Sequence, residues 1–358
     1  MTSQTNETKQ TQAAANTWAV GLSPDMVAKQ LAFYETRVKH PAMQRLLDDL
    51  MPLLMPHSES NIIVITGAPG AGKSTLTRVL LKSLFKDFAQ LMQEDASAVP
   101  LISCEAYANG EKRHSFKEIY KSLLEQLVEP GTDRKSPAVV KDGKLVMQPA
   151  TKQSVGSLRM MLEDALRERR TRVGVIDEAA HLLRLEKGTE VMDTLKSLSN
   201  TSGTKWVLVG SFDLFDLIAD NGQVARRANI LNLERYRLDK PEDRITYQEV
   251  VAKLQAKWPS EQVPNFVQIS DALLEASLGC IGLLKSLLLD ASAMQLRNGG
   301  EWNPQFLKKA AKASKIRDLI RKEIEAGEAK VRDALYGESF WDEATFSKLV
   351  HQMETGNA

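Results

Sequence analysis

The chain has 358 residues, and its 47 Lys and Arg against 46 Asp and Glu give a formal net charge of +1. At roughly 150 residues per domain, this length predicts about two folded units. Hydrophobic residues make up 43% and charged residues 26%, which excludes wholesale disorder and a collagen-like or disulfide-stapled scaffold. The near-zero charge also argues against a protein that coats nucleic acid by bulk positive charge, so a polyanion site must be a local patch.

Cysteine usage and hydropathy indicate the compartment. The two cysteines, Cys104 and Cys280, lie in apolar segments and are expected to be buried free thiols in a reducing environment. No apolar run approaches the roughly 20 residues of a membrane span. Residues 1–21 are polar, lack a signal-peptide pattern and are expected to form a disordered tail. We therefore expect a cytoplasmic protein with no membrane partner.

The first 240 residues alternate between helical and extended patterns. Ser23 and Pro24 mark a helix start, His40-Pro41 ends that helix, and a second amphipathic helix is expected over 42–54. Short apolar runs, typical of strands buried on both faces, lie at 62–65, 100–104, 173–176, 206–209 and 230–233. Helices are expected at 74–85, 115–128, 154–169 and 190–198, with an inserted loop or hairpin at 129–149. The alternation predicts an α/β fold with a parallel sheet flanked by helices.

Beyond residue 240 the strand signals stop. Helical periods dominate at 245–257, 271–277, 281–296 and 304–335. We therefore expect a core at 22–240, a smaller all-helical lid domain at 241–335 and a C-terminal tail at 336–358. An aromatic stretch at 340–346 in this tail either packs back on the lid or docks onto a partner protein.

A glycine-rich turn follows the first apolar run and precedes a helix. It satisfies the pattern G-x-x-x-x-G-K-[ST] through Gly67, Ala68, Pro69, Gly70, Ala71, Gly72, Lys73 and Ser74, followed by Thr75. Backbone N–H groups of such a loop, together with the helix N-terminus, cradle phosphate oxygens. Lys73 is expected to reach the β- and γ-phosphates, and the Ser74 hydroxyl to ligate Mg²⁺. The turn therefore predicts a site for ATP and Mg²⁺.

Two adjacent acids end the third apolar run. Asp177 is expected to hold the Mg²⁺ shell, while Glu178 orients and deprotonates the attacking water. The alternative is solvated charge at a strand tip. Because the pair accompanies a phosphate loop, hydrolysis is the better interpretation, whereas a single Asp would suit a binder or a kinase.

Further candidate residues lie between the fourth apolar run and the fifth. Ser211 is either a sensor between the acid pair and the γ-phosphate or an ordinary turn serine. Arg226 and Arg227 precede the last predicted strand, and an arginine there either reaches the neighbouring subunit to stabilise phosphoryl charge or faces solvent. The sequence does not separate the two arginines.

These elements together resemble an AAA+ ATPase, with a phosphate loop, an Asp-Glu pair, a polar sensor, an arginine finger and a helical lid. Residues 39–41 before an amphipathic helix, together with 223–227 and 279–285, resemble the TniB/TnsC family of transposition regulators. The resemblance covers roughly residues 22–296. It implies an ATP-dependent homo-oligomer, a ring or helical filament, on double-stranded DNA. Such an assembly links a targeting protein to the transposase and is disassembled by ATP hydrolysis.

The lid departs from the AAA+ pattern at one position. Many AAA+ lids carry Gly-x-x-Arg, whose arginine senses the γ-phosphate, but here residues 279–282 read Gly-Cys-Ile-Gly. Lys285, one turn later, is a candidate substitute. Because of this departure, we expect ATP hydrolysis to be slow and regulatory.

Duplex DNA in a ring would meet basic side chains on pore loops, which contact phosphates without reading bases. The candidates are Lys112 and Arg113 in the loop at 109–114 and, more weakly, Lys152. A plain exposed loop is the alternative. A basic run between residues 308 and 322, expected on one long helix, is either a solvated face or a contact for DNA or an acidic partner.

Two other classes of function remain open from the sequence. One is a helicase loader or replication initiator, which would favour single strands or a helicase partner. The other is a nucleotide-gated signalling ATPase without any DNA function.

Overall fold

The computed structural model describes residues 23–106, 116–127, 138–141, 144–147, 154–184, 188–217 and 228–336, together with residues 347 and 350. Two helices, α2 (Pro24–Glu35) and α3 (Pro41–Leu54), precede the sheet. Each begins with proline in its first turn, and the Ser23 hydroxyl accepts a hydrogen bond from the Met26 N–H at 3.3 Å, which confirms the expected N-cap.

Five parallel strands form the central sheet: β1 (Ile62–Gly67), β2 (Leu101–Glu105), β5 (Val173–Asp177), β6 (Lys205–Val209) and β7 (Ala228–Leu233). Their order is β2-β5-β6-β1-β7. Ile63 of β1 and Val175 of β5 both lie opposite Val207 of β6, so β6 is held between the strand of the phosphate loop and the strand of the acid pair. The predicted fold class is confirmed.

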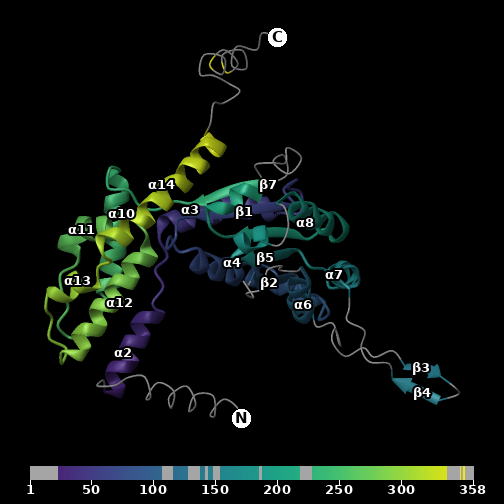
Figure 1. The fold of residues 1–358 in the computed structure, drawn as a ribbon, viewed down its shortest axis with the longest axis horizontal. Helices are drawn as coiled ribbons and strands as arrows, with labels where there is room; N and C mark the ends of the chain where they lie inside the picture. The colour runs from purple at the N-terminus through teal and green to yellow at the C-terminus, as the bar shows by residue number, and fades with distance from the viewer. Residues whose placement is uncertain are drawn as a thin grey trace.

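Helices cover both faces of this sheet (Figure 1). Strand residues alternate between two buried clusters. Ile62 and Val64 face α6 (Phe116–Gln126), α7 (Val155–Glu168) and α8 (Gly188–Ser202), whereas Ile63 and Ile65 face α3 and α4 (Lys73–Asp87). A short helix, α5 (Ala89–Glu94), follows α4. Burial on both faces explains why the strands consist of continuous apolar runs.

The segment expected to be an inserted loop or hairpin contains a hairpin. Strands β3 (Ala138–Lys141) and β4 (Lys144–Met147) pair with each other in antiparallel register. The two buried thiols are also as expected, since both Cys104 and Cys280 are free and buried. Burial raises the pKa of each thiol to about 12, so neither is a ready nucleophile.

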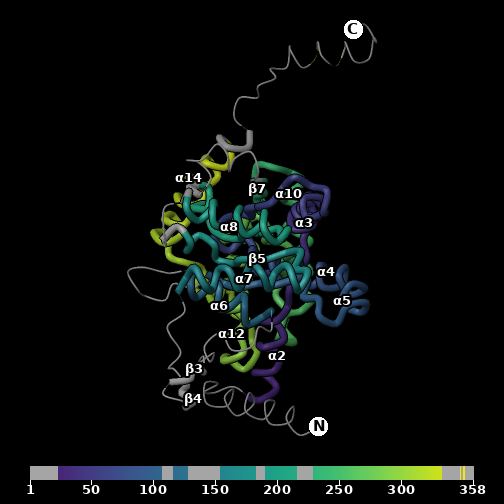
Figure 2. The backbone as a smooth tube through the Cα atoms, turned by 90° about the vertical axis from the view of Figure 1, so that its right-hand side faces the viewer, coloured from purple at the N-terminus to yellow at the C-terminus, as the bar shows by residue number. Residues whose placement is uncertain are grey.

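The lid helices have a separate aromatic core. They are α10 (Pro241–Gln255), α11 (Ser270–Ala276), α12 (Ile281–Arg297) and α13 (Gln305–Ala310). The Trp258 ring packs edge-on against Phe33, Phe266 and Trp302, with ring centroids 4.7–5.9 Å apart. Phe33 belongs to α2, which lies beside α12 in Figures 1 and 2, and the Gln30 side chain donates to the Leu289 carbonyl at 3.2 Å. The first helix is therefore part of the lid core.

The last described helix differs from the sequence expectation. The single helix expected over 304–335 is divided into α13 and α14 (Ser314–Tyr336), because Ala311 takes an extended conformation. α13 stays with the lid, whereas Ile324 and Val331 of α14 join the core cluster on the α3/α4 face. Gly327 lets α14 contact the Phe212 ring, since a Cβ there would lie 2.0 Å from a ring carbon. α14 thus returns from the lid to the sheet (Figure 1).

No single helix in the described part of the chain is long and apolar enough to cross a membrane. Residues 267–276 and α12 reach the required length and hydropathy only together, as a pair bent by 114°.

Candidate nucleotide-binding site

The glycine-rich turn connects the end of β1 to the start of α4. Gly70 and Gly72 have φ angles of 76° and 112°, in the left-handed region that favours glycine. Gly67 has no space for a side chain, because a Cβ would lie 2.9 Å from the Leu233 carbonyl oxygen of the neighbouring strand. α4 is 15 residues long and begins at Lys73 without a side-chain cap. The sequence pattern therefore folds into a loop whose first-turn N–H groups are suited to phosphate oxygens.

Lys73 lies against this loop. Its Nζ donates to the carbonyl oxygens of Gly67 at 2.8 Å and Ala68 at 3.0 Å. Burial lowers the pKa of Lys73, and the negative charges of Glu178, Asp177 and Glu323 partly oppose that effect. This half-buried ammonium, held against the loop, is suited to an anion such as a phosphate group.

The acid pair ends β5, two strands from β1. Asp177 is half-buried, and its Oδ1 accepts a hydrogen bond from the Glu178 N–H at 2.9 Å. Glu178 is exposed and has a φ of 52°, a left-handed conformation that is costly for a non-glycine residue. Such strain is concentrated at functional sites, and here it directs the chain sharply after Asp177. The Ser74 hydroxyl and the Asp177 carboxylate are hard oxygen donors, so their chemistry fits Mg²⁺.

Ser211 follows β6, the strand between the phosphate loop and the acid pair. Its hydroxyl donates to Asp213 Oδ2 at 3.1 Å. The Gly210 N–H donates to the Ile65 carbonyl at 3.0 Å, which holds this strand end beside β1. The sheet order therefore places the end of β6, which Ser211 follows, between the two motifs. A sensor role for Ser211 stays a prediction.

The lid contacts the phosphate loop directly. The Gly282 N–H, in the first turn of α12, donates to the Gly70 carbonyl at 2.7 Å. A Cβ at position 282 would lie 2.6 Å from that oxygen, so only glycine permits this approach. Lys285 is directed elsewhere: its Nζ donates to the Tyr34 carbonyl at 2.6 Å and to that of Thr36, at the end of α2. A sensor role for Lys285 stays a prediction that requires it to leave these carbonyls.

Sequence reasoning missed two residues at this site. Glu323 acts electrostatically on Lys73 although it belongs to α14, about 250 positions along the chain. No local pattern reveals it, because its position depends on the return of α14 to the core. His40 was noted only for breaking a helix and for a family resemblance, yet it lies beside Gly72. The signal for His40 was its His-Pro context at a helix start.

Several predicted site residues lie outside the described residues. They are Arg226, Arg227, Lys112, Arg113 and Lys152. The aromatic stretch 340–346 also lies outside them. The basic run is divided by the break before α14, so its members do not share one helix face as expected.

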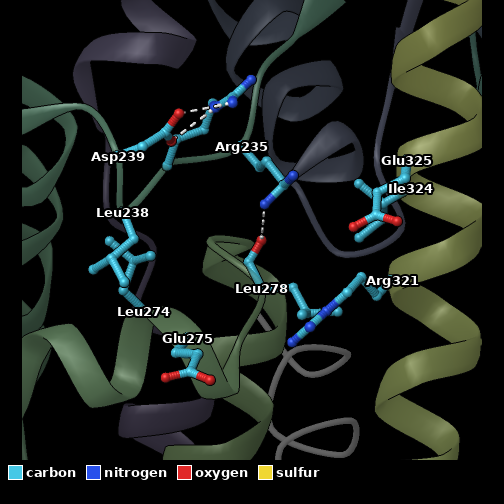
Figure 3. Close-up of a pocket in the computed structure, with 10 residues that line it drawn as sticks. Arg235, Leu238, Asp239, Leu274, Glu275, Leu278, Arg321, Ile324 and Glu325 are labelled. Atoms are coloured by element: carbon cyan, nitrogen blue, oxygen red, sulfur yellow. Dashed lines mark hydrogen bonds and ion pairs between the residues drawn. The ribbon is translucent and has the colours of Figure 1, made fainter.

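A cavity of about 470 Å³ lies between the segment after β7, the end of α11 and α14 (Figure 3). No phosphate-loop residue lines it. Arg235 crosses its wall, donating to the Leu278 carbonyl at 3.3 Å and, in a bidentate ion pair, to Glu328 of α14 at 2.7 and 3.1 Å. This ion pair ties α14 to the end of β7.

The sheet order, the phosphate loop and the helical C-terminal region define an AAA+ fold. Residues 57–218, which include the loop, the acid pair and Ser211, match a family described as an AAA domain. No curated protein shows significant similarity to the chain.

Two solved structures support the same fold. The Aeropyrum pernix ORC1 protein in complex with DNA aligns with a TM-score of 0.55 at 17% identity, over 78% of this chain and 68% of that chain. The ADP form of the Aeropyrum pernix ORC2 protein aligns with a TM-score of 0.54 at 16% identity, over 91% of this chain and 90% of that chain. At such identities the likeness shows the fold alone. None of these comparisons distinguishes the TniB/TnsC family from other AAA+ proteins.

Proposed function

We propose that the protein binds ATP with Mg²⁺ and hydrolyses it to ADP and phosphate. The observation that carries this proposal is the strand order, which aligns the phosphate loop, Ser211 and the acid pair along one edge of the sheet. Ligands of open α/β sheets bind at the carboxyl ends of the strands, where all three features lie.

Each residue then has a chemical task. The loop N–H groups and Lys73 hold the phosphates, and Ser74 and Asp177 hold Mg²⁺, which neutralises phosphate charge when bound. Glu178, exposed at the strand tip, accepts a proton from the attacking water. Ser211 orients the γ-phosphate. Arg226 or Arg227 reaches the site of a neighbouring subunit and stabilises the transferring phosphoryl group.

We further propose that ATP-bound subunits assemble as a ring or filament on double-stranded DNA and regulate transposition, linking a targeting protein to a transposase. The sequence resemblance supports this role, and basic loops carrying Lys112, Arg113 and Lys152 are the proposed phosphate contacts. A chain with a net charge of +1 has little bulk attraction for DNA. Assembly compensates by gathering a few contacts per subunit around one axis.

Hydrolysis is tested with two matched pairs of variants. Lys73→Ala is expected to abolish ATP binding, whereas Lys82→Ala, an exposed lysine on the same helix, leaves it intact. Glu178→Gln is expected to retain binding but lower kcat by ~100-fold or more, whereas Glu105→Gln, at the tip of β2, does not. Rapid hydrolysis by Glu178→Gln would refute the role of Glu178.

Assembly is tested by electron microscopy of the full chain with duplex DNA. Rings or filaments are expected with a slowly hydrolysed ATP analogue and should dissociate when ATP is hydrolysed. Glu178→Gln should trap them. Only monomers under these conditions would refute the DNA-assembly proposal while leaving ATP hydrolysis intact, and would favour the signalling ATPase.

A replication initiator or helicase loader is the second candidate. It is favoured by the fold similarity to the Aeropyrum pernix ORC1 protein, whose structure was solved with DNA. Competition between duplex and single-stranded DNA separates the candidates. Preference for single strands would favour the loader, and ATP-dependent duplex filaments that stimulate a transposase would favour the transposition regulator.

A further inference from the structure

The connection between α13 and α14 carries a concentration of positive charge. From residue 302 to residue 317 the sequence has five basic residues and no acidic one, in a chain whose net charge is only +1. These positions include the break at Ala311, which takes an extended conformation between the two helices. The charge is therefore local and is confined to one defined connection of the fold.

Four exposed lysines of this connection form what we call the junction patch: Lys308, Lys309, Lys312 and Lys315. Phe306 and Leu307, just before them, pack against the aromatic core of the lid. The Phe306 ring lies edge-on to Trp302, with ring centroids 6.0 Å apart. α13 thus turns apolar side chains inward and lysines outward. The lid core therefore anchors the junction patch at the surface.

The charge of the junction patch is not neutralised within the part of the chain that the structure describes. None of the four lysine side chains forms an ion pair or a hydrogen bond there. By contrast, the exposed Lys29 has Asp25 as a partner at 2.9 Å. Asp290 of α12 lines a small hollow together with Lys312, but the two do not form an ion pair. An anionic partner from outside the described chain would therefore find these ammonium groups available.

The composition of the junction patch suits a polyanion better than a protein surface. From Lys308 to Lys315 the exposed side chains belong only to lysine, alanine and serine. Protein interfaces need an apolar centre, and the large exposed apolar side chains of α14, Ile316 and Leu319, follow the patch rather than lie within it. Lysine ammonium groups bind phosphates as point charges and displace counterions, without reading bases. The chemistry therefore matches the phosphate backbone of a nucleic acid.

The junction patch is separate from the loops proposed above to contact DNA. Those loops precede α6 and α7 in the sequence. In Figure 1, α6 and α7 lie at one end of the molecule, whereas α13 lies at the other end among the lid helices. A contact of the junction patch with DNA is therefore independent of those loops.

We propose that the junction patch is a second DNA-binding surface, which contacts the phosphate backbone of duplex DNA without reading its sequence. It meets a stretch of duplex other than the one that the proposed pore loops contact. This inference rests on the proposed binding of DNA but not on ATP hydrolysis.

The test measures binding of the full chain to fluorescent duplex DNA by anisotropy at several salt concentrations, with and without a slowly hydrolysed ATP analogue. The junction variant replaces all four lysines of the patch with alanine. It is expected to lower the affinity by ~10-fold or more at about 0.1 M salt. The slope of log K against log salt concentration should become less steep by about 3–4, since each phosphate contact contributes about 0.9. Two duplexes of unrelated sequence should show the same loss.

A matched control variant removes the same charge from four exposed lysines on or next to α4 and α10: Lys82, Lys86, Lys253 and Lys257. It should keep the affinity and the salt slope of the wild type. A variant with arginine at the four patch positions should also keep them, because guanidinium groups bind phosphates as well. ATP affinity, measured by calorimetry, should be unchanged in every variant, which shows that the fold is intact.

Equal losses of DNA affinity in the junction and control variants would show that only net charge matters and would overturn the inference. A junction variant that binds duplex DNA as the wild type does would also overturn it, and would indicate an acidic protein as the partner of the patch. Absence of salt-dependent duplex binding by the wild type would instead overturn the proposed DNA assembly, and this inference with it, while leaving ATP hydrolysis intact.

Discussion

The contact between the lid and the phosphate loop yields a sharp prediction at Gly282. The substitution Gly282→Ala places a Cβ 2.6 Å from the Gly70 carbonyl oxygen and 3.1 Å from its Cα. Both atoms belong to the backbone, so neither can rotate away. The first turn of α12 must therefore move off the loop, and the 2.7 Å hydrogen bond from the residue 282 N–H lengthens.

Gly156 provides a matched control. Like Gly282, it is the second residue of its helix, but a Cβ there would meet only the Ser154 hydroxyl, at 3.9 Å. Gly156→Ala should raise the free energy of unfolding by about 0.5–1 kcal/mol, because alanine loses less backbone entropy on folding. Gly282→Ala gains the same entropic stabilisation. Its free energy of unfolding nevertheless falls by about 1 kcal/mol through the weakened hydrogen bond and by about 1–3 kcal/mol through steric strain. The two variants should therefore differ by about 2–4 kcal/mol.

Denaturant unfolding without nucleotide, monitored by circular dichroism, measures this difference. The m-values of both variants should match the wild type, so that midpoints report stability. If Gly282→Ala is as stable as Gly156→Ala, the lid does not press on the loop in solution and the reasoning fails.

Three further predictions concern burial and charge. Gly174→Ala should destabilise the fold by about 2 kcal/mol or more in thermal unfolding, because its Cβ would lie 2.4 Å from the fully buried Trp206 ring; a change within 0.5 kcal/mol would contradict the packing. Glu328→Ala should cost about 1–2 kcal/mol, and a double-mutant cycle with Arg235→Met should show coupling, since both side chains of this bidentate pair are only 20% exposed. Burial lowers the folded-state pKa of His40 to about 4, against about 6.5 when unfolded, so the unfolded chain binds the extra proton between these values. The free energy of unfolding should therefore fall by about 3 kcal/mol from this group as pH drops from 7 to 4, and His40→Phe should remove that part of the pH dependence in urea titrations; parallel pH profiles would exclude a buried neutral His40.

The local chemistry of the site was predictable from sequence because it depends on neighbouring residues. Glycine at position 72 permits the left-handed turn, and Lys73 follows it directly. The residue spacing alone therefore predicts the conformation of the phosphate loop. The Asp177-Glu178 pair likewise needs only a strand before it. The alternation of strand and helix patterns was sufficient to predict the fold class, because strands of a parallel sheet are buried on both faces and therefore consist of continuous apolar runs.

The tertiary structure decided which distant residues meet. The end of the helix at Ala311 could not be predicted from the sequence, because Ala311 and its neighbours are good helix formers. The break arises because α13 packs on the lid whereas α14 packs on the core. The approach of Gly282 to the loop, the charge of Glu323 near Lys73 and the hydrogen bond between His40 and Tyr236 arise in the same way. Backbone conformation and residue spacing act over a few positions and can be inferred from the chain itself. Contacts between segments about 200 positions apart or more depend on how whole helices pack, which no local pattern encodes.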